Sequence, residues 1–222
     1  MVRFAAIRRW TARTLCGGAV IVAGIVHVPA ALAFPYRADF GTTTVLAEQP
    51  IDRAAMGRVL ARADRLLAAS PLDRPGLARQ VVLTDGGWRW RMLAIGVSDA
   101  IAFRRPFAHA LIFNRHSVAA DRVTNGTPLG GVRTLSGTIA HEMIHRLVAD
   151  HIGEWAALRL PAWKREGYPD YVARETSIRP QDEALIRVRD PNARVLAYYD
   201  GRRRVAAELA RNGGSVDALL AP

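Results

Sequence analysis

Cysteine is nearly missing from this 222-residue sequence, in which Cys16 is the one example. A lone cysteine excludes an intramolecular disulfide and any metal site built from several thiolates of one chain. A metal ion in this protein would therefore have to be held by histidine and carboxylate side chains. Lysine is equally scarce: Lys164 is the one lysine, so nearly all of the 31 basic residues are arginine.

Acidic residues are missing from the first 33 positions, which contain four arginines, an uncharged apolar run over 15–28 and the small-x-small sequence Ala31-Leu32-Ala33. This pattern predicts an export signal peptide over residues 1–33, with residues 34–222 as one mature domain. The uncharged run over 14–36 is also long enough to remain as a single membrane anchor. Both forms place the rest of the chain outside the cytoplasm, either periplasmic or secreted.

The expected mature chain is long enough to bury a core of its own as one domain. The leader holds four of the 31 basic residues, which leaves 27 basic and 20 acidic side chains and a net charge of +7. No basic stretch is interleaved with aromatic residues, so we expect no nucleic-acid partner. The positive charge favours attraction to acidic peptides or anionic polymers of the cell envelope.

Two of the six histidines stand in the sequence His141-Glu142-Met143-Ile144-His145. On an α-helix, the two imidazoles project from one face and can reach one tetrahedral metal ion, with Glu142 beside it. Zinc in such a site makes a bound water acidic, and a neighbouring carboxylate can accept its proton during attack on a carbonyl. The motif therefore predicts zinc-dependent hydrolysis with Glu142 as the general base.

The residues around the motif favour a helix. Apolar side chains recur at every fourth position and form a stripe that can face a core while the histidines face a cleft; they are Leu135, Ile139, Met143 and Leu147. Thr134 or Ser136 could cap the start of this helix, and Gly153 could end it.

Two residues compete for the role of third metal ligand, and His151 is the first. It follows His145 by six residues, which is the spacing of the metzincin pattern HExxHxxGxxH. That pattern needs a glycine midway to turn the chain, and Val148 stands there instead. Met143 is the last methionine of the sequence, so the Met-turn of that pattern cannot follow.

The second candidate is Glu166, which follows His145 by 21 residues in the sequence Trp163-Lys164-Arg165-Glu166-Gly167. An HExxH motif followed by Trp-x-x-Glu-Gly at this distance resembles the gluzincin metallopeptidases, both aminopeptidase-N-like and thermolysin-like. The resemblance covers about residues 107–172. It implies a zinc ion bound by His141, His145 and Glu166.

The same resemblance gives a role to Asp170, one helical turn beyond Glu166. In thermolysin-like enzymes a carboxylate at this offset orients a zinc-bound histidine. Pro169 departs from the family pattern, because proline inside a helix removes a hydrogen bond. If this helix begins near Pro161, a kink at Pro169 would move Asp170 away from that role.

Helical spacing predicts a packing helix over 51–69, after an irregular or extended lead-in at 34–50. Further helices are expected over 181–188 and 193–212, with Ser215 capping a last short one. Gluzincins often stabilise the oxyanion of the reaction with a tyrosine or histidine from a later segment, and Tyr198 and Tyr199 are the candidates here. Aromatic packing is the favoured explanation of both tyrosines.

Strands are expected over 81–83 and 88–95, joined as a hairpin at Asp85-Gly86-Gly87. Alternation in the second strand would put Trp88 and Trp90 on one face, where core packing is favoured over a ligand platform.

A further strand over 107–114 is expected at the sheet edge beside the cleft, where an extended peptide could pair with it. The polar residues 117–133 are typical of a loop over the active site. The nearby histidines, His109 and His116, are expected to be ordinary polar residues rather than metal ligands.

These patterns predict an α+β protein with a zincin-like fold. A small mixed or antiparallel sheet packs on an active-site helix and is followed by a mostly helical C-terminal part. The resemblance implies an exported zinc metallopeptidase that acts on peptides or proteins, acidic ones included. Two alternatives stay open: a metzincin-like site with His151, and a non-catalytic, zinc-containing module for binding or assembly in the cell envelope.

Overall fold

A five-stranded sheet forms the centre of the computed structural model of this chain, which describes residues 29–221 except 129, 177 and 179. Its strand order is β1-β2-β3-β5-β4. The strands are β1 (Tyr36–Phe40), β2 (Thr43–Ala47), β3 (Arg79–Leu83), β4 (Ala102–Arg104) and β5 (Ala110–Phe113). The inner pairs β2–β3 and β3–β5 are parallel, whereas β1 and β4 pair antiparallel with their neighbours and form the two edges.

Both faces of the sheet are covered, which explains why its central strands are apolar at successive positions. Val81 and Leu83 pack in the main core with α2 (Arg53–Leu67) and α4 (Leu135–Ile152). Val82, which points to the opposite face, packs with residues of α3 (Trp88–Leu93) in a second core.

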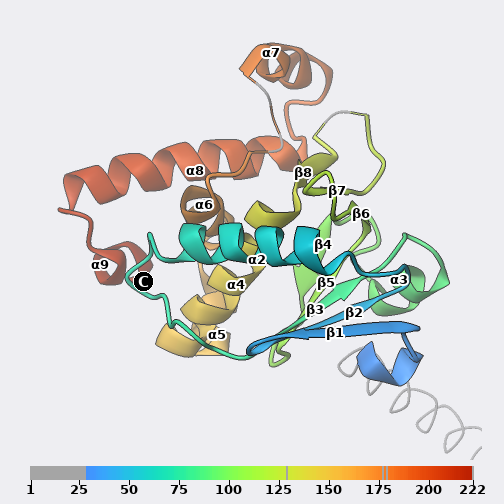
Figure 1. Cartoon of the computed structure of the whole chain (residues 1–222). Helices are drawn as coiled ribbons and strands as arrows, with labels where there is room; N and C mark the ends of the chain where they lie inside the picture. Colours follow the sequence, from blue (N-terminus) through green and yellow to red (C-terminus); the bar gives the residue numbers. More distant parts are fainter. Residues whose placement is uncertain (1–28, 129, 177, 179, 222) are drawn as a thin grey trace, which may run out of the picture.

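The remaining helices follow α4 in the chain. They are α5 (Glu154–Arg159), α6 (Ala162–Ala173), α7 (Pro180–Arg189), α8 (Arg194–Arg211) and α9 (Val216–Leu220). Among them, α8 lies beside α6 (Figure 1). Helices α6 and α8 approach most closely at Gly167, where an added Cβ would lie 2.4 Å from the Gly201 carbonyl carbon. The two glycines therefore let α6, which carries Glu166, pack directly against α8, which carries Tyr198.

The structure confirms the α+β class, the mixed sheet and the helical C-terminal part. The packing helix expected over 51–69 is α2, whose N-cap Asp52 accepts a hydrogen bond from the Ala55 N–H. The extended lead-in is the β1–β2 hairpin. The last helices also stand where the sequence predicted them, with Ser215 capping α9.

The strand expected over 88–95 is wrong, because residues 88–93 form α3. Trp90 is buried and its ring lies 5.5 Å from that of Phe103, whereas half of Trp88 is exposed. The two tryptophans thus do not share one buried face. Over six residues, polar and apolar positions that alternate satisfy a short helix almost as well as a strand.

Two further expectations need correction. The strand within 107–114 is β5, which lies between β3 and β4, so the sheet edge is β4 instead. Residues 117–133 are not simply a loop, because most of a second, antiparallel sheet lies there. It consists of β6 (Arg115–Ser117), β7 (Arg122–Thr124) and β8 (Val132–Thr134). Strands of three residues are too short to show a period in the sequence.

Most of the expected signal peptide, residues 1–28, lies outside the described part of the chain. The next residues form a short 3₁₀ helix, η1 (Pro29–Leu32), and the Leu32 carbonyl accepts a hydrogen bond from Arg89 Nε at 3.0 Å. Among the described residues, no helix has the length and apolar character required to cross a bilayer.

Candidate metal centre

Helix α4 presents the two histidines of the HExxH motif toward α6. Its N-cap is Thr134, whose side chain accepts a hydrogen bond from the Gly137 N–H at 3.0 Å. It ends at Gly153, which has a φ of 89°, a conformation that favours glycine. The apolar stripe expected for this helix is buried in the main core, so both capping expectations and the orientation of the helix are confirmed.

Three side chains from α4 and α6 converge on one point. The Nε2 atoms of His141 and His145 are 3.0 Å apart, and Glu166 Oε2 lies 3.7 and 3.4 Å from them, respectively. One donor atom from each residue falls within 4.8 Å of the other two. Ligands held at normal zinc distances in a tetrahedron are about 3.3 Å apart, so this group could bind a metal ion.

Glu166 is held as an anion in this group. Burial would raise the pKa of its carboxyl, but His145 and His141 outweigh that effect and hold the pKa well below its usual value. An ionised carboxylate is the form that binds a metal.

Asp170 orients the ring of His141 through a contact with its Nδ1 atom. His141 Nδ1 lies 2.7 Å from Asp170 Oδ1, and the aspartate is almost fully buried. An ionised carboxylate can accept but not donate, so Nδ1 carries the proton and Nε2 is the nitrogen that could bind a metal ion. Burial would lower the pKa of His141, but Asp170 and then Glu166 attract its proton and raise the pKa to about 9.

Pro169 does not displace Asp170. Helix α6 begins at Ala162, just after Pro161, and continues through Pro169 to Ala173. The preceding residue, Tyr168, anchors the helix by a buried hydrogen bond of 2.7 Å between its hydroxyl and that of Ser70. The kink considered from the sequence therefore leaves Asp170 in contact with His141.

Arg133 completes the polar group, and its role was not predicted from the sequence. Its Nη1 and Nη2 donate to the two Asp170 oxygens at 2.7 and 2.8 Å, from the buried position directly before the Thr134 cap. An arginine at the start of a helix is ordinarily solvated. The one hint lies in β8, where alternation places Arg133 on the opposite face from the exposed Val132.

Two cavities meet at the candidate metal centre. The first, here named the α5 cavity, has a volume of about 200 Å³ and is lined by the three ligand candidates, by other charged residues and by apolar residues that include Phe103, Leu158 and Leu160. The second, named the α8 cavity, has a volume of about 300 Å³ and is lined by residues that include Arg133, Thr138 and Val195. Residues common to both are Ala102, His141, Glu142 and Tyr198.

The two candidate tyrosines lie in different surroundings. The ring of Tyr198 is 6.3 Å from that of His141, and Tyr198 lines both cavities. Tyr199 packs instead in a small cluster with Ile186 and Leu196. A hydrogen bond with Glu183 raises the pKa of the Tyr199 hydroxyl. Only Tyr198 is thus brought to the metal centre.

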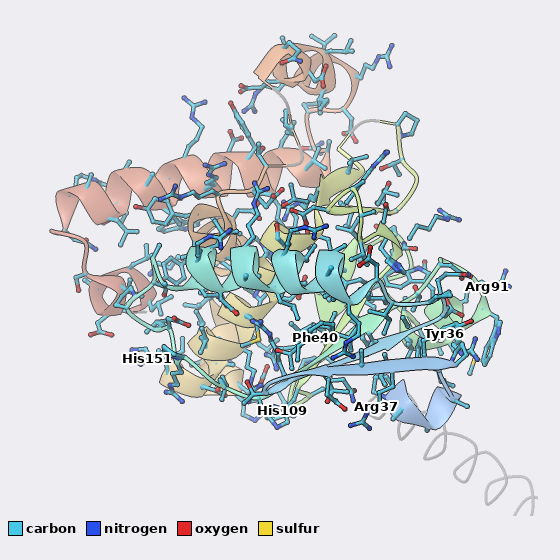
Figure 2. All side chains as sticks on the ribbon, viewed as in Figure 1. Tyr36, Arg37, Phe40, Arg91, His109 and His151 are labelled. Atoms are coloured by element: carbon cyan, nitrogen blue, oxygen red, sulfur yellow. The ribbon has the colours of Figure 1, made fainter. Side chains whose placement is uncertain are left out.

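The other histidines lie apart from this group. His151 Nε2 is 2.6 Å from Asp217 Oδ1 on α9, and Figure 2 shows both His151 and His109 at the periphery of the molecule. His116 Nδ1 is 2.8 Å from the Thr84 carbonyl oxygen.

No protein-family model, curated protein or solved structure matches this chain.

Proposed function

We propose that this protein is an exported zinc-dependent peptidase of gluzincin type, with zinc held by His141, His145 and Glu166. The observation that carries the proposal is the position of Glu166 Oε2, 3.4 and 3.7 Å from the two histidine Nε2 atoms of an HExxH helix. Two imidazoles and one carboxylate form a donor set that suits zinc and leaves one position for a reactant. The proposed location, periplasmic or secreted, rests on the N-terminal sequence pattern alone.

The roles of the surrounding residues follow from their contacts. Zinc, when bound, supplies the Lewis acidity that polarises a peptide carbonyl and makes a water molecule acidic. Glu142 lines both cavities beside the ligands, where its carboxylate would accept a proton from the attacking water and pass it to the leaving amine. Tyr198, which also lines both cavities, would donate a hydrogen bond to the oxyanion that forms at the attacked carbonyl.

The free edge of β4 supports a peptide as the substrate. The Asn114 N–H donates to the Ile101 carbonyl at 3.0 Å. Because hydrogen-bonded and non-bonded pairs alternate in an antiparallel ladder, the backbone groups of Ala102 and Arg104 then face away from β5. Both residues line the α5 cavity. An extended peptide can pair with them as an added strand and cross the metal centre.

The two alternatives have less support. A metzincin-like site needs His151 at the metal, but His151 contacts Asp217 instead. A non-catalytic zinc module needs blocked access, whereas two cavities meet at Glu142.

The test compares the purified protein with its Glu166→Ala and Glu142→Gln variants for zinc content and for hydrolysis of a mixed peptide library. We expect about one zinc per chain in the parent and a large loss in Glu166→Ala. Glu142→Gln should keep its zinc and lose hydrolysis by about 10²-fold or more. Glu183→Ala, which removes a carboxylate on α7, is the matched control and should change neither quantity.

Each outcome has a separate meaning. A folded parent that takes up no zinc after incubation with the metal would refute the site. A parent that binds zinc through Glu166 but cleaves no peptide would identify the non-catalytic module instead.

A further inference from the structure

Two solvent-exposed aromatic rings lie at the rim of the α5 cavity. Phe107 and Trp155 are 61% and 64% exposed, and their rings meet edge to face with centroids 5.6 Å apart. The residues directly before them, Pro106 and Glu154, line the cavity itself. Exposed apolar side chains usually occur singly, so two that come together beside a cavity call for an explanation.

The backbone at Phe107 is held in an unfavourable conformation. Residues 105–108 form a turn that the Ala108 N–H closes by donating to the Arg105 carbonyl at 3.1 Å. Phe107 occupies its third position with a φ of 61°, where turns of this kind normally have glycine. A bulky side chain there costs free energy, and strain of this sort is found chiefly at functional sites.

A buried ion pair holds the two rings together. Arg104 donates to both carboxylate oxygens of Glu154 at 2.5 and 3.2 Å, and the two side chains are 7% and 13% exposed. Arg104 also donates to the Ala108 carbonyl at 3.2 Å. The turn that carries Phe107 is thereby tied to the first turn of α5, which carries Trp155. The exposed rings are thus fixed in place by buried structure.

The edge of β4 leads toward this pair. Phe107 follows Arg104 by three residues, so it lies within about 11 Å of the end of the strand. A peptide added along Ala102 and Arg104 would therefore continue past the two rings. This continuity with the proposed substrate path favours a peptide side chain as the occupant.

We propose that Phe107 and Trp155 form a binding site for one large apolar side chain of an extended peptide, at least two residues from the bond that is cut. The proposal rests on the peptidase function proposed for the adjoining metal centre. It makes the protein selective for internal segments that carry a Phe, Trp or Leu at one fixed distance from the cut.

The test measures binding and cleavage of labelled peptides made of Gly, Ser and Ala, each with a single Phe or Leu at a different position. Binding is measured by fluorescence polarisation in the zinc-loaded Glu142→Gln background, and cleavage in the otherwise unchanged chain. Each measurement is repeated with Phe107→Gly and Trp155→Ala. Phe107→Gly is informative because glycine suits the positive φ, so the thermal midpoint should not fall when the ring is lost. Trp88→Ala, which removes a half-exposed tryptophan on α3, is the matched control.

We expect one peptide position at which the apolar residue raises affinity and kcat/KM by about tenfold. Phe107→Gly and Trp155→Ala should each abolish that preference, while Trp88→Ala should keep it. Equal binding of all peptides by the parent, or a preference that survives both variants, would overturn the proposal. Binding of the parent to phosphatidylcholine vesicles that both variants lose, with unchanged peptide selectivity, would also overturn it and identify a membrane contact. If no peptide is cleaved, the peptidase proposal fails, and the binding data alone decide whether the two rings hold an apolar peptide side chain.

Discussion

Arg133 and Asp170 form a two-bond ion pair behind the candidate metal centre, with each guanidinium nitrogen donating to a different carboxylate oxygen at 2.7 and 2.8 Å. One of those oxygens also contacts His141 Nδ1. The carboxylate therefore cannot rotate without breaking bonds to both neighbours. Arg133 thus fixes the direction in which His141 presents its other nitrogen.

Arg133→Met should weaken zinc binding by about 10- to 100-fold, because the carboxylate that orients His141 loses its fixed position. The variant should also lose about 3–5 kcal/mol of stability, since it leaves a buried charge without its main partner. Competition with a chromophoric chelator measures the first effect, and urea unfolding the second. Arg79→Met is the control, because Arg79 is also buried and pairs with Asp64 on α2. Equal zinc affinities in the two variants would contradict this role.

Zinc affinity should rise with pH, by about tenfold per unit below pH 9. The reason is that the pKa of His141 in the metal-free protein is raised to about 9, so the metal must displace a proton. Glu166 adds nothing to this dependence near neutrality, because its pKa is well below the usual value. Chelator competition at several pH values gives the slope. Asp170→Asn, which removes the charge that attracts the proton, should flatten it.

The stability of the metal-free protein should fall as the solution becomes alkaline. The pKa of His141 is raised from 6.5 to about 9, so the protonated form stabilises the fold fully below the unfolded pKa. That contribution, on the order of 3 kcal/mol, is lost as pH rises through about 9. Thermal unfolding in the presence of a chelator measures it. His141→Gln should remove this part of the pH dependence, and an unchanged profile in that variant would refute the assignment.

Gly167→Ala should destabilise the protein by about 1–3 kcal/mol, because the new methyl group would overlap the Gly201 backbone. Helix α6 would have to move, so zinc affinity should fall as well. Gly57→Ala on α2 is the matched control: a Cβ there meets no atom within 4 Å, and the change should stabilise by about 0.5–1 kcal/mol. Both effects are read from urea unfolding and zinc titration.

Tyr198→Phe should lower kcat by about 100-fold with little change in zinc content, because the hydroxyl placed for the oxyanion is lost. Tyr199→Phe is the natural control, since Tyr199 packs against Ile186 and Leu196. Its kcat should match that of the parent. If the two variants retain equal activity, oxyanion stabilisation must come from another group.

Local signals in the sequence were sufficient to predict helix α4. Its apolar stripe, the Thr134 cap and the Gly153 end all depend on residues within a turn of each other. Glu166 and Asp170 could also be placed, because the resemblance supplied the link between two segments that the chain itself separates. Neither the helix nor these two residues required knowledge of the sheet to be predicted.

The features that were not predicted from the sequence depend on contacts between residues far apart in the sequence. The edge position of β4 is set by strand order, and three residues carry no periodicity. Residues 88–93 satisfy a strand pattern, but their packing beneath the sheet favours a helix. Arg133 is an unremarkable arginine until α6 brings Asp170 to it, because burial of a charge is not visible from spacing.

The contacts that hold α6 also bear on when the protein can acquire its metal. The Gly167–Gly201 crossing and the Tyr168–Ser70 hydrogen bond join α6 to α8 and to the end of α2 without using any of the three ligands. We therefore expect the polypeptide to fold without the metal ion and to bind it afterwards. If the chain is exported in unfolded form, as its N-terminal pattern predicts, the proposed activity would then depend on the supply of zinc outside the cytoplasm. A chelator should remove the ion reversibly. Adding zinc back should restore the bound state without a refolding step.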